Sequence, residues 1–378
     1  MIRELHLRAF KRFQDERLRL APLTLLTGFN SGGKSSAMQA LLLLRHATIM
    51  AGDGDAPKRA VPLNAPGLTL GNLKAVVNEI TGRGEFSAGV DTGSVRVEWT
   101  FGSPECPTDS LAIPTTSSTS PPGSTEAATI RRALRTLRFV PADRHGPAET
   151  YPLDDPARHE MPGARAELSF GNLWWLLNQD SRNGALRHPD PSVPATFDHQ
   201  VKAWLTDLFP GVELEARPVD HANLMTLGVR TNAELRFHRP SNVGFGITYV
   251  LPVIISLLMA EPGDIVMLEN PEAHLHPRAQ SRVARLCAKA AAAGVQVIVE
   301  SHSDHVLNGV RVAVHGGEIA PDDVSVLFFA APSKEPKASV EHIRVDRRGR
   351  LDGWPEGFFD EGDRLLDRLL EPVGSGGP

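Results

Sequence analysis

A segment rich in glycine and serine, GFNSGGKSS at 28–36, constrains the fold more than any other part of the chain. It follows the apolar run LTLLT and precedes AMQALLLLRHA, whose apolar residues have helical spacing. The segment matches G-x-x-x-x-G-K-S, with its fixed positions at Gly28, Gly33, Lys34 and Ser35. Such glycines let successive backbone N–H groups face phosphate oxygens, the lysine reaches the β- and γ-phosphates, and the serine hydroxyl binds Mg²⁺. The strand–loop–helix context predicts a nucleotide site rather than a chance glycine-rich turn.

The second half of the chain alternates apolar strands with helices. DIVML, VQVIV and VSVLFFA are predicted strands, and PRAQSRVARLCAKAAAA is a predicted helix between the first two. This alternation predicts right-handed crossovers and a mostly parallel sheet. The N-terminal runs IRELHLRAF and RLRL predict an antiparallel β subdomain beside it. The expected fold is therefore an α/β phosphate-loop NTPase with helices flanking the sheet.

Composition divides the chain further. The Ser/Thr/Pro-rich stretch IPTTSSTSPPGST predicts a mobile surface loop that cannot pack a core. The predicted regions are an N-terminal ATPase lobe at 1–101, this loop at 102–128, a mixed insertion at 129–240, a C-terminal ATPase lobe at 241–330 and a tail at 331–378.

Charge and cysteine content exclude several classes of protein. The net charge of −5 gives no overall basic surface for nucleic acid, so a DNA contact would need a local patch. Two cysteines, Cys106 and Cys287, cannot form a disulfide framework. The longest apolar run, Val250–Ala260, is too short to span a bilayer, and the charged N-terminus is no signal peptide. We expect a cytoplasmic protein without membrane contact.

A second cluster of polar residues lies in VMLENPEAHLHP, at 266–277. Glu269 ends the predicted strand DIVMLE, where a phosphate-loop enzyme needs an acid for Mg²⁺. The strand VQVIV likewise ends in Glu300, Ser301 and His302. Because the carboxyl ends of parallel strands share one edge, we expect Glu269, Glu272 and His302 to converge on one γ-phosphate.

The two histidines of this segment, His274 and His276, have two other interpretations. Alternate spacing would place both imidazoles on one face of an extended segment, as a zinc site requires, but neither cysteine is near. The simpler alternative is that both histidines only orient the loop through hydrogen bonds.

Four motifs together carry a family resemblance: TGFNSGGKS, SNVGFGITYVLPVI, MLENPEAHLHP and VESHSDH. Their order resembles the ABC-type ATPase heads of the RecF/SMC and OLD-nuclease group. The chain is most similar to the stand-alone bacterial AAA proteins that end in a small domain of unknown function. The resemblance covers the phosphate loop and everything from about Ser241 onward, whereas the middle third matches loosely.

This resemblance implies roles for individual residues. It implies ATP and Mg²⁺ as cofactors and a head-to-tail homodimer, or a higher oligomer, that closes on two ATP molecules. The implied nucleotide contacts are Gly28, Asn30, Ser31, Gly32, Gly33, Lys34, Ser35, Ser36, Asn242, Gly244 and Gly246. The implied catalytic residues are Glu269, Glu272, His302 and Asn270, with Ser35 and Glu269 at the metal. Residues Ser241–Gly246, here named the signature loop, would cap the nucleotide of a second head; alternatively, they begin an ordinary helix.

The sequence departs from the ABC pattern at two places. Asn270 stands where many heads have the glutamate that polarises water, so Glu272 is expected to take that role, or hydrolysis is slow. No clear Q-loop glutamine occurs between Gly71 and Arg83, where Asn72 and Asn78 are substitutes by position only. Arg144 is a further cation that could face a phosphate or form a loop salt bridge.

The tail is short and lacks an acid-rich strand array, so we expect the ATPase to gate a separately encoded effector, such as a nuclease in phage defence. The alternative is a RecF-like repair ATPase that clamps DNA. Only the run IRRALRTLR hints at a basic stripe for DNA, and such a run is more often a solvated helix face. A transporter subunit fits poorly because FKRF and NPEAHLHP differ from those subunits.

Overall fold

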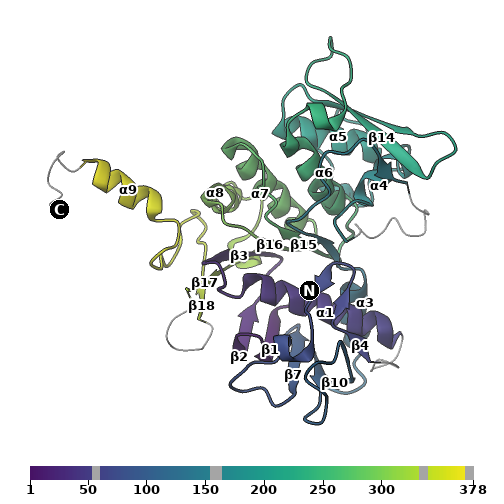
Figure 1. The fold of residues 1–378 in the computed structure, drawn as a ribbon. Coiled ribbons are helices and arrows are strands. Elements are labelled where there is room, and N and C mark those ends of the chain that lie inside the picture. Colours follow the sequence, from purple (N-terminus) through teal and green to yellow (C-terminus); the bar gives the residue numbers. More distant parts are fainter. Residues whose placement is uncertain (53–59, 154–163, 332–338, 371–378) are drawn as a thin grey trace, which may run out of the picture.

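The computed structural model describes residues 1–52, 60–153, 164–331 and 339–370, and its centre is a six-stranded sheet (Figure 1). The strand order is β11-β15-β16-β3-β17-β18. These strands span Arg138–Val140, Ile265–Glu269, Gln296–Glu300, Leu23–Gly28, Val324–Phe329 and Val340–Ile343. All neighbours pair in parallel except β18, which is antiparallel to β17. The predicted α/β fold with a mostly parallel sheet is confirmed.

A second, antiparallel sheet forms the N-terminal subdomain in the order β10-β8-β7-β1-β2. Its strands span Thr115–Ser120, Arg96–Gly102, Glu85–Asp91, Glu4–Phe10 and Phe13–Arg19. The prediction of a mobile loop at 102–128 is wrong in its centre, because Thr115–Ser120 pairs with β8 along six residues. Alternating burial of β10 explains the difference: an edge strand needs only one face packed, so small hydroxyl residues suffice.

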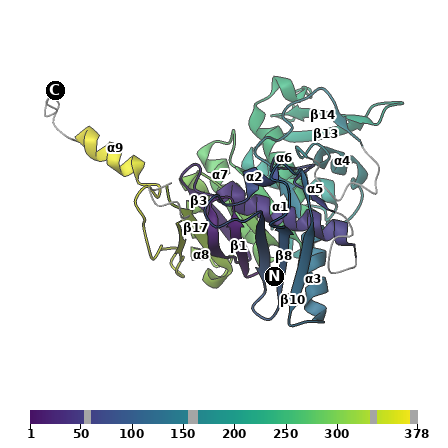
Figure 2. The same ribbon diagram turned by 60° about the horizontal axis from the view of Figure 1, so that its bottom comes forward.

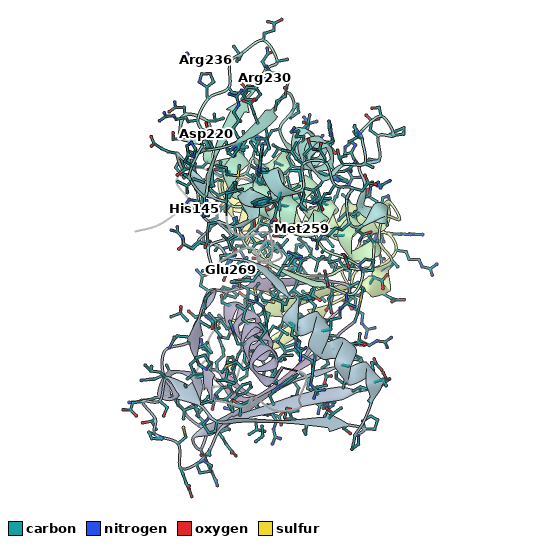
Figure 3. All side chains as sticks on the ribbon, turned by 90° about the vertical axis from the view of Figure 1, so that its right-hand side faces the viewer. His145, Asp220, Arg230, Arg236, Met259 and Glu269 are labelled. Atoms are coloured by element: carbon teal, nitrogen blue, oxygen red, sulfur yellow. The ribbon has the colours of Figure 1, made fainter. Side chains whose placement is uncertain are left out.

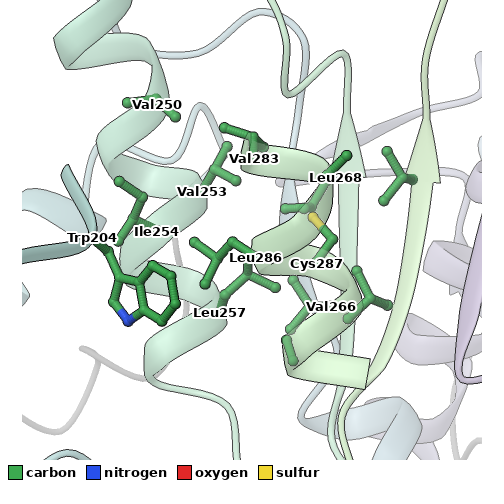
Figure 4. Close-up of a cluster of buried hydrophobic side chains, with 14 of the residues drawn as sticks. Trp204, Val250, Val253, Ile254, Leu257, Val266, Leu268, Val283, Leu286 and Cys287 are labelled. Atoms are coloured by element: carbon green, nitrogen blue, oxygen red, sulfur yellow. The ribbon is translucent and has the colours of Figure 1, made fainter. Parts of the chain in front are cut away.

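Helices cover both faces of the central sheet. On one face, α1 (Lys34–Ala51) packs between the two sheets, with α3 (Thr125–Arg135) beside it. The other face carries α6 (Phe245–Leu258), α7 (Pro277–Ala292) and α8 (Asp304–His315). Successive residues of β3 enter different cores, since Leu25 belongs to one cluster and Leu26 to the other. Figure 4 shows the first cluster, where α6 and α7 meet over strand residues such as Val266.

The middle third forms a separate lobe above the sheet (Figure 1). It contains α4 (Ser169–Trp175), α5 (Phe197–Leu208) and a sheet of order β12-β14-β13. Those strands span Tyr151–Pro152, Leu224–Arg230 and Glu213–Pro218. Shorter elements are β4 (Val61–Pro62), β5 (Asn64–Ala65), β6 (Leu68–Thr69), α2 (Leu73–Val76), β9 (Ala112–Ile113), η2 (Gly184–Leu186), η3 (Pro240–Asn242) and η4 (Pro321–Asp323).

The C-terminal helix α9 (Glu361–Leu370) projects away from the body in both ribbon views (Figures 1 and 2). Its four leucines are exposed, at 48% for Leu365 and 80% for Leu369. Parts of the predicted tail at 331–378, namely 332–338 and 371–378, lie outside the described residues. Within the described part of the chain, no helix has the length and hydropathy needed to cross a membrane.

Candidate functional site: a phosphate cavity at the sheet edge

The phosphate loop connects β3 to α1 and depends on two glycines. Gly28 and Gly33 both have φ of +116°, a conformation that side chains disfavour. A Cβ atom on Gly28 would also lie 2.3 Å from the carbonyl oxygen of Phe329 on β17. The first helical residue, Lys34, is only 3% exposed, and its Nζ donates to the carbonyls of Gly28 (3.0 Å) and Phe29 (2.8 Å). The loop conformation is therefore held by contacts within the chain, with its lysine folded over it.

Three parallel strands end beside this loop. In the register of the sheet, Glu269 of β15 lies opposite Glu300 of β16, and Glu300 lies opposite Leu26 of β3. Figure 3 shows Glu269 at the waist of the molecule, between the lower antiparallel sheet and the upper lobe. A cavity of about 320 Å³ opens at this edge, here named the phosphate cavity. It is lined by Asn30, Ser31, Gly33, Lys34, Ser35, Ser36, Glu269, Asn270, Glu300 and His302.

Glu269 and Asn270 both line the cavity, as the sequence predicted. The Glu269 Oε2 atom accepts a hydrogen bond from the backbone N–H of Ala142 at 2.9 Å, which fixes the carboxylate. Asn270 has φ of +45°, and its N–H donates to the carbonyl of Glu300 at 2.8 Å. Its buried Oδ1 atom has no hydrogen-bond partner among the described residues. An orphaned acceptor of this kind fits a site that water or a ligand completes.

Glu269 and His302 line the cavity, but Glu272 does not. The expectation that all three residues converge there is therefore wrong for Glu272. Glu272 is 9% exposed, and its Oε1 accepts from the Ser301 hydroxyl (2.8 Å) and the His302 N–H (3.1 Å). Burial raises the pKa of Glu272. The Glu272 carboxylate thus fixes the segment after β16 through these hydrogen bonds. Because Glu272 does not line the cavity, the geometry does not support its expected role in activating water.

Glu300 lines the cavity, although the sequence argument gave it no role. It is 4% exposed, and both carboxylate oxygens accept from the Ser35 hydroxyl at 3.1 Å. Burial and the nearby charge of Glu269 raise the pKa of Glu300 to about 7. Its place at the carboxyl end of VQVIVE was the available signal, since the argument that placed Glu269 applies equally to it.

His302 lines the cavity from the segment after β16 and is exposed. Partial burial, together with the positive charge of Lys34, lowers the pKa of His302 below its ordinary value. A neutral imidazole at physiological pH can either donate or accept a hydrogen bond. His302 is therefore placed where it can contact a terminal phosphate next to Lys34.

Arg144 does not line the phosphate cavity, and it forms no ion pair with the residues that the structure describes, so neither expected role is seen there. It is fully buried, and it donates to the carbonyls of Glu269 (2.7 Å) and Asn270 (2.8 Å). Its guanidinium also lies 5.5 Å from the ring centre of Tyr249 on α6. Burial lowers the pKa of Arg144 to about 10, which still leaves it charged at neutral pH. Arg144 thus supports the backbone that carries Glu269.

The signature loop residues are not among those that line the phosphate cavity of the same chain. Gly244 precedes α6 and is exposed, and no heavy atom of the described residues lies within 4 Å of a Cβ built on it. Asn242 and Phe245 are exposed too, the latter at 54%. Gly246 differs, because its Cβ would lie 2.6 Å from the His274 carbonyl oxygen. Gly244 and Asn242 can face a partner, whereas Gly246 packs inside the chain.

The two histidines near Glu269 have local structural contacts. His276 caps α7, with its Nδ1 accepting from the Arg278 N–H at 3.3 Å. The His274 ring packs against Tyr249 at 4.6 Å between ring centres. The described residues include no cluster of three or more histidines, cysteines or carboxylates suited to a metal ion. The structure therefore favours the loop-orienting interpretation over zinc.

Neither proposed substitute for the Q-loop glutamine lies in the cavity. Asn72 caps α2 by accepting from the Ala75 N–H at 3.1 Å. Asn78 bonds the carbonyl of Lys11 and the N–H groups of Ile80 and Thr81. Both amides form hydrogen bonds within turns of the N-terminal subdomain. The suggestion that either asparagine takes the place of the Q-loop glutamine is therefore wrong.

The polar groups that line the cavity fit a nucleoside triphosphate with Mg²⁺. A lysine ammonium and the N-terminus of the 18-residue helix α1 provide the positive end. The Ser35 hydroxyl and the carboxylates of Glu269 and Glu300 are hard oxygen ligands of the kind that Mg²⁺ prefers. Cation-binding and phosphate-binding groups thus line one small cavity.

Comparison with known proteins agrees with this geometry. Residues 127–308 match the family model described as "AAA domain, putative AbiEii toxin, Type IV TA system". Residues 319–369 match a family described only as a protein of unknown function, DUF3696. The first match begins after the phosphate loop and includes β15, β16 and the signature loop. No curated protein matches the sequence significantly.

Two solved structures share the fold over almost the whole chain. One is an Smc head bound to the C-terminal winged-helix domain of ScpA, with a TM-score of 0.57 and 11% identity, covering 92% of this chain and 98% of that chain. The other is a Pyrococcus furiosus Smc head with an extended coiled coil bound to the C-terminal domain of ScpA, with a TM-score of 0.52 and 10% identity, covering 98% and 99%. At these identities the similarity establishes the fold alone, which is that of an Smc head.

Proposed function

We propose that this chain, an AAA-domain protein with the SMC-head fold and a C-terminal domain of unknown function, binds ATP and Mg²⁺ in the phosphate cavity. The observation that carries the proposal is the preformed loop around Lys34, which faces carboxylates from two neighbouring strands in a cavity of about 320 Å³. Lys34 and the N-terminus of α1 bind phosphate oxygens, and Ser35 and Glu269 hold the ion. Bound Mg²⁺ would neutralise charge on the β- and γ-phosphates.

We further propose that two chains pair head to tail around two nucleotides and hydrolyse ATP slowly. The phosphate cavity contains no group from the signature loop, and Gly244 and Asn242 face solvent on the same chain. A second chain can supply this loop to complete the ligand shell. Slow turnover follows from Asn270, an amide that cannot accept a proton, and from Glu272, which lies outside the cavity.

The output of the cycle passes, in this proposal, to a separately encoded effector, such as a nuclease in phage defence. The AAA model that matches this chain is described by a putative toxin of a type IV system, and α9 offers a surface for a partner protein. This helix projects from the body with Leu365, Leu366, Leu369 and Leu370 exposed. Exposed apolar helix faces commonly mark interaction sites.

The alternative of a DNA clamp finds less support in the structure. The basic run 131–138 does not form one face, because Arg138 is buried on β11 while Arg131 and Arg135 contact Thr119 and the Thr48 carbonyl. Filter binding to duplex DNA, with and without ATP across a salt series, decides between the two functions. ATP-dependent DNA binding with a steep salt slope would favour the clamp.

Calorimetry with ATP and Mg²⁺ on Lys34→Ala tests nucleotide binding. We expect affinity to fall by at least about 100-fold, the equivalent of about 2.7 kcal/mol, because a buried charge-assisted contact is lost. Lys74→Ala, which removes an exposed lysine on α2, is the matched control and should bind as the wild type does. If Lys34→Ala misfolds, Lys34→Met keeps the aliphatic stem. Unchanged affinity in a folded Lys34 variant would refute the assignment.

A further inference from the structure

Glu300 is the cavity residue for which the ABC pattern supplies no role. It lies at the end of β16, 4% exposed, between the phosphate loop and Glu269. Its two oxygens accept from the hydroxyl of Ser35, a residue 265 positions away in sequence. The carboxylate of this pair is buried, whereas Ser35 is exposed, and both residues line the phosphate cavity.

We propose that Glu300 is a second carboxylate ligand of the Mg²⁺ site, beside Glu269. Glu300 accepts from the Ser35 hydroxyl, and the two side chains would face the same ion. This inference rests on the proposed binding of ATP and Mg²⁺, and it deepens that function by naming a further ligand of the cation.

The spacing of the two side chains supports a shared ion. Octahedral Mg²⁺ binds oxygen at 2.0–2.1 Å, which places adjacent ligand oxygens about 2.9 Å apart. The Ser35 Oγ atom lies 3.1 Å from each Glu300 oxygen, so little movement is needed. Among the described residues, Glu300 is the carboxylate that accepts a hydrogen bond from Ser35.

The charges of the cavity give this role a distinctive consequence. Glu269 and Glu300 lie opposite each other on neighbouring strands, so two carboxylates face any phosphate bound at Lys34. Without a cation they repel the triphosphate, whereas with Mg²⁺ they attract the ion that the triphosphate carries. Removing the charge of Glu300 should therefore change ATP affinity in opposite directions under the two conditions.

The experiment is ATP titration of Glu300→Gln by calorimetry, in excess Mg²⁺ and again in EDTA. Glutamine keeps the size of the side chain and an oxygen that can accept from Ser35. We expect affinity in Mg²⁺ to weaken by about 10–100-fold, the range for groups that orient or hold a metal. In EDTA, affinity should strengthen relative to the wild type. The matched control is Glu98→Gln, because Glu98 accepts from the Ser87 hydroxyl at 2.9 Å in the N-terminal sheet.

Each other outcome has a defined meaning. Equal affinities of Glu300→Gln and wild type under both conditions, or a parallel loss under both, would overturn the inference and leave Glu300 as a structural residue. A wild type that binds no ATP would refute the proposed function itself. If Glu300→Gln does not fold, Glu300→Asp keeps the charge and should bind metal-free ATP as weakly as the wild type. Tighter metal-free binding by the aspartate variant would contradict the inference.

Discussion

The phosphate cavity and the signature loop differ in how far one chain completes them. Around the cavity, Lys34, Glu300 and Arg144 are almost fully buried and have hydrogen-bond partners within the chain. At the signature loop, Gly244 and Phe245 face solvent. The cavity groups are held by contacts within the chain, whereas the loop displays groups that a second molecule could use.

This difference indicates where mutations should act. The buried polar side chains at the cavity have hydrogen-bond partners within the chain instead of water. Removing one of them should therefore lower both the free energy of unfolding and the affinity for nucleotide. Groups on the signature loop have few contacts to lose within the chain. Their substitution should leave the fold intact and affect association alone.

The largest effect on stability is expected from Arg144→Ala. This change leaves the buried carbonyls of Glu269 and Asn270 without their donor, and we expect a loss of about 3–5 kcal/mol in the free energy of unfolding. Urea denaturation followed by circular dichroism measures it. The control is Arg165→Ala, since Arg165 forms an exposed ion pair with Asp143 and should contribute less than about 1 kcal/mol. Equal losses for both variants would show that burial of Arg144 is unimportant.

Gly244→Arg should have no measurable effect on the free energy of unfolding. It should weaken only the association of two chains, and by less free energy than Arg144→Ala costs in stability. In the described part of the chain no heavy atom lies within 4 Å of the added Cβ, so we expect the fold to be retained. A bulky charge in a closed interface should weaken ATP-dependent dimerisation by about 100-fold, or about 2.7 kcal/mol. Light scattering with ATP and Mg²⁺ measures the dimer, with Gly184→Arg as a control at another open glycine. The head-to-tail arrangement fails if Gly244→Arg dimerises as well as Gly184→Arg.

The smallest expected effect is a change in the pH dependence of stability, and it comes from His46 on α1. Burial, together with the charge of Arg45, lowers the pKa of His46 from 6.5 to about 4. The unfolded chain therefore takes up a proton as the pH falls from 6.5 towards 4 while the folded chain does not, so stability is lost across that window. At pH 5.5 the loss is on the order of 1 kcal/mol. Melting at pH 7.5 and 5.5 should show a smaller drop for His46→Gln than for wild type or for His315→Gln, an exposed control.

The sequence predicted the parts of the site that depend on local pattern. The motif at 28–36 and the strand ending at Glu269 are short segments whose meaning does not depend on distant residues. The pairing of Ser35 with Glu300 could not be predicted so directly, because it depends on the register of β16 beside β3. Composition alone also failed to predict β10. Its serines and threonines are poor core residues, but backbone pairing with β8 stabilises the strand.

The misplaced Glu272 has a conformational cause. Asn270 and His274 both have positive φ, at 45° and 61°, so the loop between them turns sharply after β15. This turn aims Glu272 at Ser301 and the His302 N–H rather than into the cavity. Spacing in sequence placed Glu272 two residues from the catalytic position, but spacing cannot show the direction of a side chain after left-handed residues.

The central claim is that one chain supplies the phosphate cavity and another supplies the signature loop. Mixing two defective chains tests it most directly: Lys34→Ala lacks the cavity lysine, and Gly244→Arg lacks a usable loop. Neither chain alone should turn over ATP. Each mixed dimer has one intact site of two. Because Gly244→Arg weakens association, the mixture is measured at chain concentrations at which light scattering shows dimers, and there it should regain up to about a quarter of wild-type turnover. An equimolar mixture as inactive as its components, while wild-type chains hydrolyse ATP, would contradict a site shared between two chains.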